Sequence, residues 1–361
     1  MEVRVIAFYL PQFHPIPEND KWWGKGFTEW TNVTQAKPLF KGHYQPHLPA
    51  DLGFYDLRLP EVREAQAEMA KNYRIEGFCY WHYWFSGKRL LDRPLNEVLT
   101  SGKPNFPFCI GWANESWTRS WEGDEKEIII KQQYSPEDDL AHARWLTSVF
   151  SDSRYISISG RPLFVIYRPP MLPDARRTID TFRSECVRLG MAEPYIVGRD
   201  THYPGVDMRE FGCDITETSV PRLDFLFREF TPFGLDLIRN LRQGVFNRKL
   251  KIYNYSEACE RTESYRPKHP FITGFLVGWD NTPRRGRNAV ILNGTTPQAF
   301  GNLLRNNLKT LAYEQPELRI IFVNAWNEWA EGMHLEPDQK WGYGFLEALK
   351  VELSRYQDNA Y

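Results

Sequence analysis

The chain alternates between short apolar runs and longer segments in which apolar residues recur at helical spacing. Eight runs have the length of buried strands, at Val3–Tyr9, Gly77–Trp84, Phe106–Ala113, Leu163–Tyr167, Tyr195–Val197, Cys213–Thr216, Phe271–Val277 and Arg319–Asn324. Helices are predicted at Pro60–Tyr73, Pro136–Phe150, Asp174–Leu189, Pro297–Tyr313 and Gly344–Tyr356. Ser135 is expected to cap the second of these helices, because Pro136 and three acidic residues follow it.

Short apolar strands separated by helices indicate a parallel sheet that is covered on both faces. About eight such units in 361 residues predict an α/β fold, a single (β/α)8 TIM-type barrel. The alternative is an open doubly wound sheet, but the segment Tyr9–Pro15 after the first strand contains no glycine for a phosphate-binding turn. One catalytic domain is expected over residues 1–361, with long βα-loop insertions near 11–59 and 221–270.

Charge, cysteine content and hydropathy narrow the class of partner and the compartment. The 45 Lys and Arg residues nearly balance the 46 Asp and Glu residues, which does not favour nucleic acid as a partner. The five cysteines have no zinc-type spacing, and the first residues enter a strand with no signal sequence. No apolar stretch reaches the length of a membrane span, so no integral membrane segment is expected. Together these features predict a cytoplasmic protein.

Polar and aromatic side chains gather where the predicted strands end. The 13 Trp, 18 Tyr and 23 Phe residues are equally suited to filling a large core. In a barrel, however, the carboxyl ends of the strands form the reactive face, and sugar rings stack on aromatic side chains. The predicted substrate-binding residues, at these ends or in the first insertion, are Tyr9, His14, Trp30, Trp81, His82, Tyr83, Trp112, Asn114, Glu115, Tyr167, Trp279, Asp280, Asn281, Trp326, Asn327 and Trp329.

Two glutamates follow the last predicted strand and are the predicted catalytic pair. Glu328 and Glu331 lie three residues apart, so in a turn or a helical start both side chains point the same way. Glycosidic chemistry needs two carboxyl groups, one as acid and one as base or nucleophile. Two neighbouring carboxyls beside Trp326 and Trp329 are expected to have separated pKa values, which leaves one protonated. The alternative is a capping acid beside a solvated glutamate.

Other polar residues allow a structural interpretation as well as a functional one. Glu115 suits either a substrate-contacting acid or a supporting residue. Asp280 and Asn281 suit either sugar hydroxyls or an Asx turn. The first insertion carries tryptophans that either form a stacking wall or pack the insertion onto the barrel, namely Trp22, Trp23 and Trp30.

Histidines and arginines give no clear indication of a cofactor. The histidines near strand ends and in the first insertion are His14, His43, His47 and His82. They lack the paired spacing of a metal site, so no metal and no cofactor are expected. A small basic cluster either meets a diphosphate or acidic sugar or forms a solvated loop, and it consists of Arg284, Arg285 and Arg287.

Five long motifs occur in order along almost the whole chain, at Ala7–Pro15, Gly26–Val33, Trp112–Glu115, Gly278–Arg284 and Asn324–Gly332. Together they resemble the WbsX-type family, described as glycosyltransferases of bacterial surface-polysaccharide biosynthesis. The resemblance implies a role in O-antigen or lipopolysaccharide assembly. It also implies an oligosaccharide or polysaccharide substrate, including a lipid-linked precursor.

The chain is also similar, more distantly, to glycoside hydrolase family 99, the endo-α-mannosidases and endo-mannanases. The Asn-Glu-Trp-His-Glu-Gly motif of that family matches at Asn327, Glu328, Trp329, Glu331 and Gly332. The resemblance implies a metal-independent retaining barrel in which Glu328 deprotonates the sugar 2-hydroxyl to give a 1,2-anhydro intermediate. Glu331 is then the general acid and base. Ala330 stands where the hydrolases have histidine, which puts the hydrolase substrate in question.

Three functions remain open from the sequence. The first is action at a glycosidic bond of a surface polysaccharide or its precursor, by cleavage or by transfer. The second is a sugar-nucleotide-dependent glycosyltransferase, although neither a DxD motif nor a phosphate loop is present. The third is a catalytically silent barrel that binds glycans.

Overall fold

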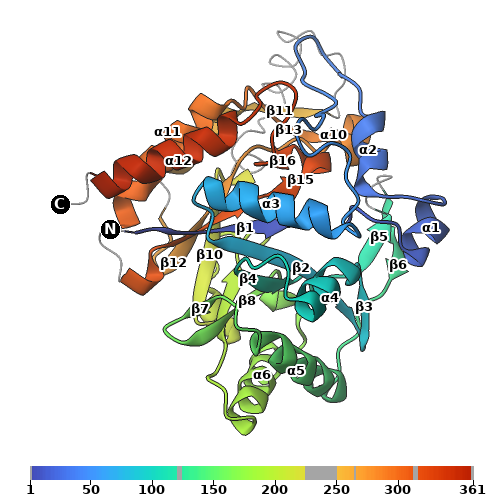
Figure 1. The fold of residues 1–361 in the computed structure, drawn as a ribbon, viewed down its shortest axis with the longest axis vertical. Helices are drawn as coiled ribbons and strands as arrows, with labels where there is room; N and C mark the ends of the chain where they lie inside the picture. Colours follow the sequence, from blue (N-terminus) through green and yellow to red (C-terminus); the bar gives the residue numbers. More distant parts are fainter. Residues whose placement is uncertain (1, 120–123, 224–249, 264–265, 312–315, 359–361) are drawn as a thin grey trace.

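Eight parallel strands close into a barrel in the computed structural model, which describes residues 2–119, 124–223, 250–263, 266–311 and 316–358. In order around the barrel the strands are β1 (Arg4–Tyr9), β2 (Gly77–Phe85), β4 (Phe108–Trp112), β8 (Arg161–Ile166), β9 (Tyr195–Arg199), β10 (Ile215–Val220), β12 (Phe271–Leu276) and β14 (Ile320–Asn324). Ala7 of β1 pairs with Phe78 on one side and with Val323 on the other, so the sheet has no free edge there. The predicted (β/α)8 barrel is confirmed (Figure 1).

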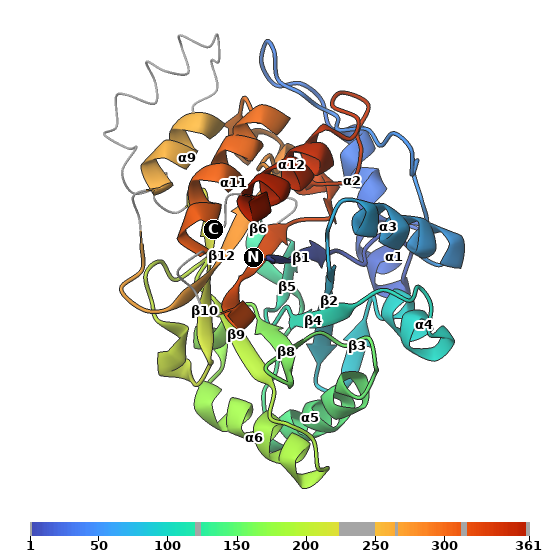
Figure 2. The ribbon, with the colours of Figure 1, turned by 60° about the vertical axis from the view of Figure 1, so that its left-hand side comes forward.

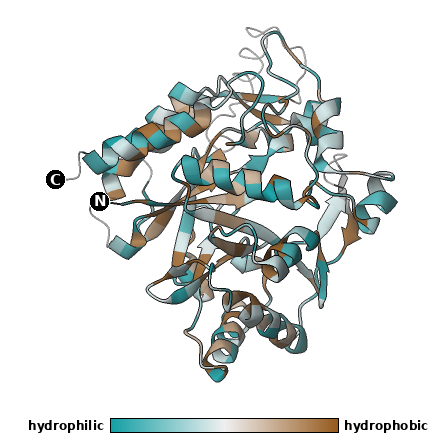
Figure 3. Ribbon diagram, viewed as in Figure 1, coloured by the Kyte–Doolittle hydropathy of each residue, from teal (hydrophilic) through white to brown (hydrophobic). Residues whose placement is uncertain are grey.

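Helices cover the outside of the barrel (Figure 2). They are α3 (Pro60–Asn72), α4 (Arg93–Ser101), α5 (Pro136–Phe150), α6 (Ala175–Arg188), α9 (Tyr255–Glu263), α11 (Pro297–Leu311) and α12 (Gly344–Asp358). The strands are mostly hydrophobic, whereas the helices carry hydrophilic residues on their outer faces (Figure 3). The predicted cap of α5 is confirmed, because the Ser135 hydroxyl accepts a hydrogen bond from the Asp138 N–H at 3.2 Å.

The sixth barrel strand extends beyond its predicted range of Cys213–Thr216. β10 continues to Val220 through residues that are polar yet buried. Thr216 accepts a hydrogen bond from the Met208 N–H at 2.9 Å, and Thr218 donates one to Asp200 at 3.1 Å. The hydropathy pattern therefore ends before the strand does, because buried partners satisfy its hydroxyl groups.

Shorter elements connect the strands and helices of the barrel. The first insertion contains α1 (Pro17–Trp23) and α2 (Glu29–Gln35), and α10 (Thr282–Arg285) packs against α2. The short strands are β3 (Lys88–Leu90), β5 (Trp117–Arg119), β6 (Asp124–Ile130), β7 (Ser157–Ile158), β11 (Lys251–Asn254), β13 (Val290–Asn293), β15 (Asn327–Glu328) and β16 (Met333–His334). The 3-10 helices are η2 (Pro169–Met171), η3 (Met208–Phe211), η4 (Gly286–Asn288), η5 (Pro316–Leu318) and η6 (Trp329–Glu331).

The second predicted insertion, near residues 221–270, is described only in part. Residues 224–249 and 264–265 lie outside the described residues, while β11 and α9 belong to the remainder and β11 pairs in parallel with β13. All five cysteines are buried free thiols. Among the described helices, none combines the length and the apolar character needed to cross a bilayer.

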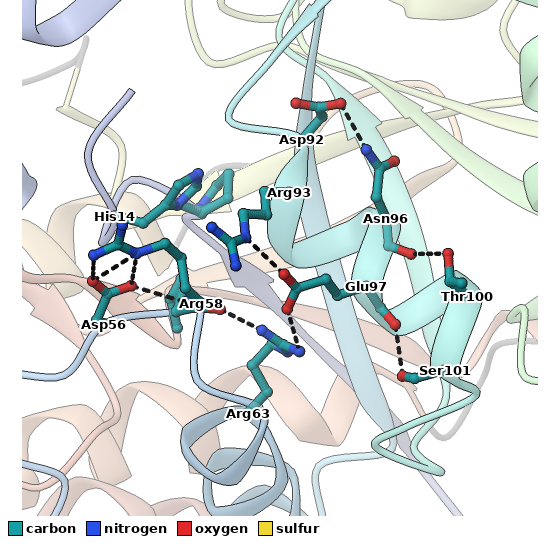
Figure 4. Close-up of polar contacts among 12 residues, drawn as sticks. His14, Asp56, Arg58, Arg63, Asp92, Arg93, Asn96, Glu97, Thr100 and Ser101 are labelled. Carbon is teal, nitrogen blue, oxygen red and sulfur yellow. Dashed lines mark hydrogen bonds and ion pairs between the residues drawn. The ribbon is translucent and has the colours of Figure 1, made fainter. Parts of the chain in front are cut away.

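A buried arginine connects α3 to α4 on one side of the barrel (Figure 4). Arg63 donates to the Leu57 carbonyl at 2.5 Å and lies 2.8 Å from Glu97, which also accepts from Arg93 at 2.7 Å. Removing Glu97 would leave the buried guanidinium of Arg63 with its charge less well compensated, whereas the Glu97 side chain itself is 31% exposed. This contact fixes the segment that leads from the first insertion into α3.

The barrel interior also contains a buried ion pair. Arg199 of β9 donates to Glu217 of β10 at 2.7 Å, and the two side chains are 4% and 0% exposed. The Arg199 guanidinium lies 4.5 Å from the ring centroid of Phe8. Gly274 of β12 leaves room for this pair, because an added Cβ would lie 1.7 Å from Glu217 Oε1.

We expect Gly274→Ala to lower the free energy of unfolding by about 1–3 kcal/mol or more, because the new methyl group displaces the Glu217 carboxylate. Denaturant unfolding of the full chain measures this change. Gly301→Ala in α11 is the matched control, since its nearest neighbour would lie 3.7 Å away, and it is expected to stabilise by up to about 1 kcal/mol. Equal stability of the two variants would contradict the tight packing around Glu217.

Candidate active site

The two candidate catalytic glutamates lie on a tight turn directly after β14. Glu328 ends β15, Glu331 ends η6, and β15 pairs antiparallel with β16. Gly332 closes the turn with a φ of 63°, a left-handed conformation that glycine adopts without strain. An added Cβ at Gly332 would also lie 3.1 Å from Asp280. The turn sits at the carboxyl end of the barrel, where (β/α)8 enzymes carry their active sites.

One arginine connects both glutamates to a third carboxylate. Arg284, at the end of α10, lies 2.5 Å from Glu331 Oε1 through Nη1 and 3.3 Å from Glu328 Oε2 through Nη2. Its Nε donates to Glu29 Oε1 at 2.8 Å. The Glu331 side chain is the most exposed of the four, at 20%. Three carboxylates therefore share one guanidinium where water has little access.

Glu29 is a residue that the sequence-based site omits. It begins α2 and is fully buried, and its second oxygen accepts from Gln12 Nε2 at 2.8 Å. The Glu29 N–H also donates to the Gln12 carbonyl at 3.0 Å. The signal available in the sequence is that Glu29 and Arg284 each stand in one of the five family motifs. Gln12 and Glu29 position Arg284, which in turn positions the glutamate pair.

Burial and repulsion by neighbouring carboxylates raise the pKa values of both glutamates. Burial, followed by the charge of Glu331, raises the pKa of Glu328 to about 8. Burial also raises the pKa of Glu331, while Arg284 acts in the opposite direction. The pair therefore retains a proton at neutral pH. Because Arg284 lies closer to Glu331 than to Glu328, this geometry favours an ionised Glu331 and a protonated Glu328.

Four of the predicted substrate-binding residues face the barrel mouth with the pair, and they are Trp81, Tyr83, Glu115 and Tyr167. Burial raises the pKa of Tyr83 strongly, and Glu328 is the charge that adds most to this rise. Glu115 lies 3.1 Å from Arg168, and its pKa is raised by burial and by Glu331. The rings of Trp81 and Tyr167 meet edge to face, with centroids 5.4 Å apart. The site thus offers aromatic surface beside its acids.

Three of the predicted asparagines hold loops together through their backbones. Asn114 donates to and accepts from the backbone of Arg168 at 2.9 and 2.8 Å. Asn327 does the same with Leu10, accepting at 2.7 Å and donating at 3.1 Å. Asn281 accepts from the Val290 N–H at 2.9 Å. These amides position the strand ends that carry the site.

Four predicted residues instead face the helices, and they are Tyr9, His82, Trp112 and Trp326. Tyr9 donates to Gln66 of α3 at 2.6 Å, and His82 Nε2 lies 3.1 Å from His142 Nε2 of α5. The Trp112 ring packs on His142 at 4.7 Å, and Trp326 packs on Phe78. Alternate residues of a strand point to opposite faces, so Tyr9, His82 and Trp112 point outside the barrel, and Trp326, which lies beyond the end of β14, is placed there by its contact with Phe78. No direct substrate contact is proposed for them.

The first insertion packs through tryptophans onto the turn that carries Glu328 and Glu331. Trp30 and Trp329 have ring centroids 5.5 Å apart and are 8% and 1% exposed. The Trp30 indole donates to the Tyr55 carbonyl at 2.9 Å, and the Trp329 indole donates to Glu336 at 2.7 Å. Of the two sequence-based interpretations for Trp30, these contacts support packing of the insertion.

The remaining predicted residues lie beside the pair or farther from it. Asp280 accepts from His43 and Gln45 at 2.7 and 2.8 Å, and its N–H donates to the Glu331 carbonyl at 2.6 Å. Trp279 lines a cavity that adjoins Asp280 and Gly332. His14 bonds the Pro11 carbonyl at 2.9 Å and lies with the Asp56–Arg58 pair (Figure 4).

The basic cluster at residues 284–287 divides into two parts. Arg284 is turned inward onto three carboxylates, whereas Arg287 is exposed on the surface. A guanidinium already held by three acids has little capacity left for a diphosphate. The structure therefore assigns Arg284 to the carboxylate cluster.

Glu328→Gln is expected to change how stability depends on pH. A carboxyl with a raised pKa contributes stability that is present below its unfolded-state pKa and is lost as the pH rises through about 8. The amide removes this titration, so the melting temperature of the variant should fall less than that of the wild type between about pH 5 and about pH 8. Glu260→Gln, at an exposed position, is the control. Parallel curves for Glu328→Gln and wild type would show that the carboxyl is not perturbed.

Comparison with solved structures shows the fold of this site's scaffold. The chain is similar to a GH99 endo-alpha-mannosidase from Bacteroides thetaiotaomicron, with 14% identity, a TM-score of 0.57 and coverage of 98% of both chains. It is similar to a protein described as glycoside hydrolase-like, with 13% identity, a TM-score of 0.59 and coverage of 98% and 94%. At such identities the likeness concerns the fold alone.

Comparison of sequences identifies the family. The "Uncharacterized protein WxcX" of Xanthomonas campestris pv. campestris is 39% identical over 366 residues, which cover 100% of this chain and 51% of that protein. The chain thus spans about half the length of this relative. A family described as "Glycosyltransferase WbsX" matches residues 5–349. The chain therefore belongs to the WbsX glycosyltransferase family.

Proposed function

We propose that this carbohydrate-active enzyme breaks or transfers a glycosidic bond with retention of configuration, using Glu328 and Glu331. The observation that carries the proposal is the shared position of the two carboxyls. Both lie on one turn at the barrel mouth, share Arg284 and retain a proton between them. Acid and base catalysis at one glycosidic bond needs such a pair in two protonation states. Family membership supports a bacterial surface polysaccharide, or its lipid-linked precursor, as the substrate.

The proposed reaction has two steps. The Glu328 carboxylate takes the proton of the sugar 2-hydroxyl. The sugar O2 then attacks C1 while the bond from C1 to the leaving oxygen breaks. Glu331 gives its proton to that leaving oxygen, and a 1,2-anhydro sugar results. Water or an acceptor hydroxyl then opens the ring at C1 and loses its proton to Glu331, while the sugar O2 regains the proton from Glu328. Aromatic rings such as Trp81 and Tyr167 offer surface on which a sugar can stack.

These roles require the shared proton to change places. Arg284 favours the ionised form of Glu331, so the proton resides on Glu328 in the geometry described above. A leaving-group oxygen that hydrogen-bonds Glu331, and a 2-hydroxyl that donates to Glu328, both favour the opposite arrangement. Substrate binding is thus proposed to move the proton to the residue that acts as the acid.

A transfer from a sugar nucleotide is the second candidate, because the family description names glycosyltransferases. Such an enzyme must balance the negative charge of the diphosphate in the sugar nucleotide with cationic groups. Within the described residues, the arginine nearest to the glutamate pair is bound to three carboxylates. Transfer between glycans, with a hydroxyl acceptor in place of water, agrees both with the family description and with the acid pair.

We expect Glu331→Gln and Glu328→Gln to differ in their response to the leaving group. Either variant should lower kcat/KM on a natural glycoside by about 10²–10⁴-fold. In an aryl glycoside with an acidic phenol, the phenolate leaves without being protonated. Such a substrate should therefore restore the first step in Glu331→Gln but not in Glu328→Gln. Release of the phenol measures both.

A 2-deoxy substrate serves as the control for the proposed attack by the 2-hydroxyl. It should not be cleaved, because its C2 carries no oxygen. Rescue of Glu328→Gln instead of Glu331→Gln would reverse the two roles. Turnover of the 2-deoxy substrate would exclude the anhydro intermediate and favour a carboxylate nucleophile.

Calorimetry with two ligand panels tests the substrate class. The full chain should bind α-linked oligosaccharides or lipid-linked repeat units, and the affinity should persist in Glu328→Gln while product formation stops. Nucleotide sugars should give no heat of binding. Tight binding of a nucleotide sugar would support the second candidate, and binding of glycans with unchanged products in both variants would contradict the assigned pair.

A further inference from the structure

A cluster of possible ligand atoms lies beside the catalytic turn and outside the proposed reaction. A cavity of about 190 Å³ adjoins Asp280 and Gly332. Its lining includes His47 of the first insertion, His334 of β16 and Asp338 of the segment that follows. His47 Nδ1 lies 2.9 Å from His334 Nε2, and that nitrogen lies 3.8 Å from Asp338 Oδ2. One ligand atom from each of the three residues lies within 4.8 Å of the others.

The hydrogen bonding of His334 leaves one ring nitrogen unprotonated, with its lone pair directed at His47. His334 Nδ1 lies 3.0 Å from the Glu336 carbonyl oxygen, which can only accept a hydrogen bond. Nδ1 therefore carries the proton, and Nε2 turns its lone pair toward His47 and Asp338. A histidine that ligates a metal through one nitrogen and donates to a carbonyl from the other has this arrangement.

Asp338 brings a buried oxygen that lacks a partner. The residue is 2% exposed, and its Oδ1 accepts from the N–H groups of Lys340 and Trp341 at 2.9 and 2.5 Å. Its Oδ2 has no hydrogen-bond partner of good geometry among the described residues, and the Tyr44 hydroxyl, whose pKa is raised by burial and then by Asp338, is its nearby polar neighbour. A buried carboxylate oxygen without a partner costs free energy, which a cation would compensate.

The backbone holds these ligands in place before any ion binds. The Gln339 N–H donates to the Leu48 carbonyl and the Ala50 N–H donates to the Pro337 carbonyl, both at 2.9 Å. These bonds join the loop that carries His47 to the segment that carries Asp338. A preorganised set of ligands loses little conformational freedom on binding a metal.

We propose that His47 Nδ1, His334 Nε2 and Asp338 Oδ2 bind a divalent transition-metal ion of the Zn²⁺ type. Two imidazoles and one carboxylate suit Zn²⁺, whereas Ca²⁺ and Mg²⁺ prefer oxygen ligands. Ligand atoms of a tetrahedral zinc site lie roughly 3.3 Å apart, a value between the 2.9 Å and 3.8 Å that separate His334 Nε2 from the other two ligand atoms. Metal binding replaces the hydrogen bond between the histidines, and the proton that His47 Nδ1 donates in that bond moves to Nε2. The adjoining cavity supplies water as the fourth ligand.

The ion acts on the position of the catalytic turn and not on the reaction itself. His334 stacks on Trp329 with ring centroids 3.8 Å apart, and Trp329 lies between Glu328 and Glu331 in the chain. The site therefore links the first insertion to the turn that carries both glutamates. Lys340 rests on the rings of Tyr44 and Trp341, at 4.3 and 4.7 Å, so its charge weakens the attraction for a cation only in part.

Titration of the chelator-treated full chain with Zn²⁺ alone tests this site by calorimetry. We expect one ion per chain with a dissociation constant of ~1 µM or tighter. The affinity should fall by about 100-fold in His47→Gln and in Asp338→Asn, because each removes one ligand. His269→Gln is the matched control, and it should bind as the wild type does. Zn²⁺ should also raise the melting temperature of wild type but of neither ligand variant.

Two outcomes would overturn the proposal. The first is no saturable binding to the wild type at Zn²⁺ concentrations of about 100 µM. The second is unchanged binding in both ligand variants, which would place the ion elsewhere. Anomalous diffraction from wild-type crystals soaked in Zn²⁺ needs no variant, and its peak should lie between His47, His334 and Asp338. A peak at any other position would also contradict the site.

Discussion

The rest of the candidate site depends on the ion pairs of Arg284 with three carboxylates. Its guanidinium bonds Glu29, Glu328 and Glu331, which come from the first insertion and from the turn after β14. Burial raises the pKa of Glu328, and the excess of negative charge that three acids leave around one cation raises it further. The same arginine thus gathers the acids and leaves their charge incompletely balanced. That imbalance keeps a proton available for chemistry.

The loops around Arg284 are held by polar contacts to backbone and by aromatic packing. Asn327 joins the catalytic turn to Leu10, and Trp30 packs on Trp329. Many of the polar side chains near the strand ends therefore serve geometry and not substrate. The strands of a barrel are rigid, but its loops are not. The loops therefore need contacts of their own before they can hold two carboxyls close together.

The sequence predicted the barrel and the placement of Glu328 and Glu331 on one turn, because both depend on local patterns. Apolar runs mark buried strands, and two acids three residues apart share one side of a turn. Local sequence patterns do not predict contacts between distant segments. Arg284 and Glu29 are 255 residues apart, and His47 and His334 are 287 residues apart. The outward orientation of His82 was also hidden, since β2 is apolar on both faces and its pattern does not show which side faces the helices.

Barrel closure has a consequence for when this site comes into existence. Strand β1 pairs with β14, and Asn327 bonds Leu10 across 317 residues of sequence. Contacts of such separation form late, because the loop between them must close first. During synthesis, the first insertion therefore cannot pack on the turn after β14 until that last strand has been made. A chain truncated before β14 lacks the pairing that closes the barrel, so its first insertion has no turn after β14 on which to pack.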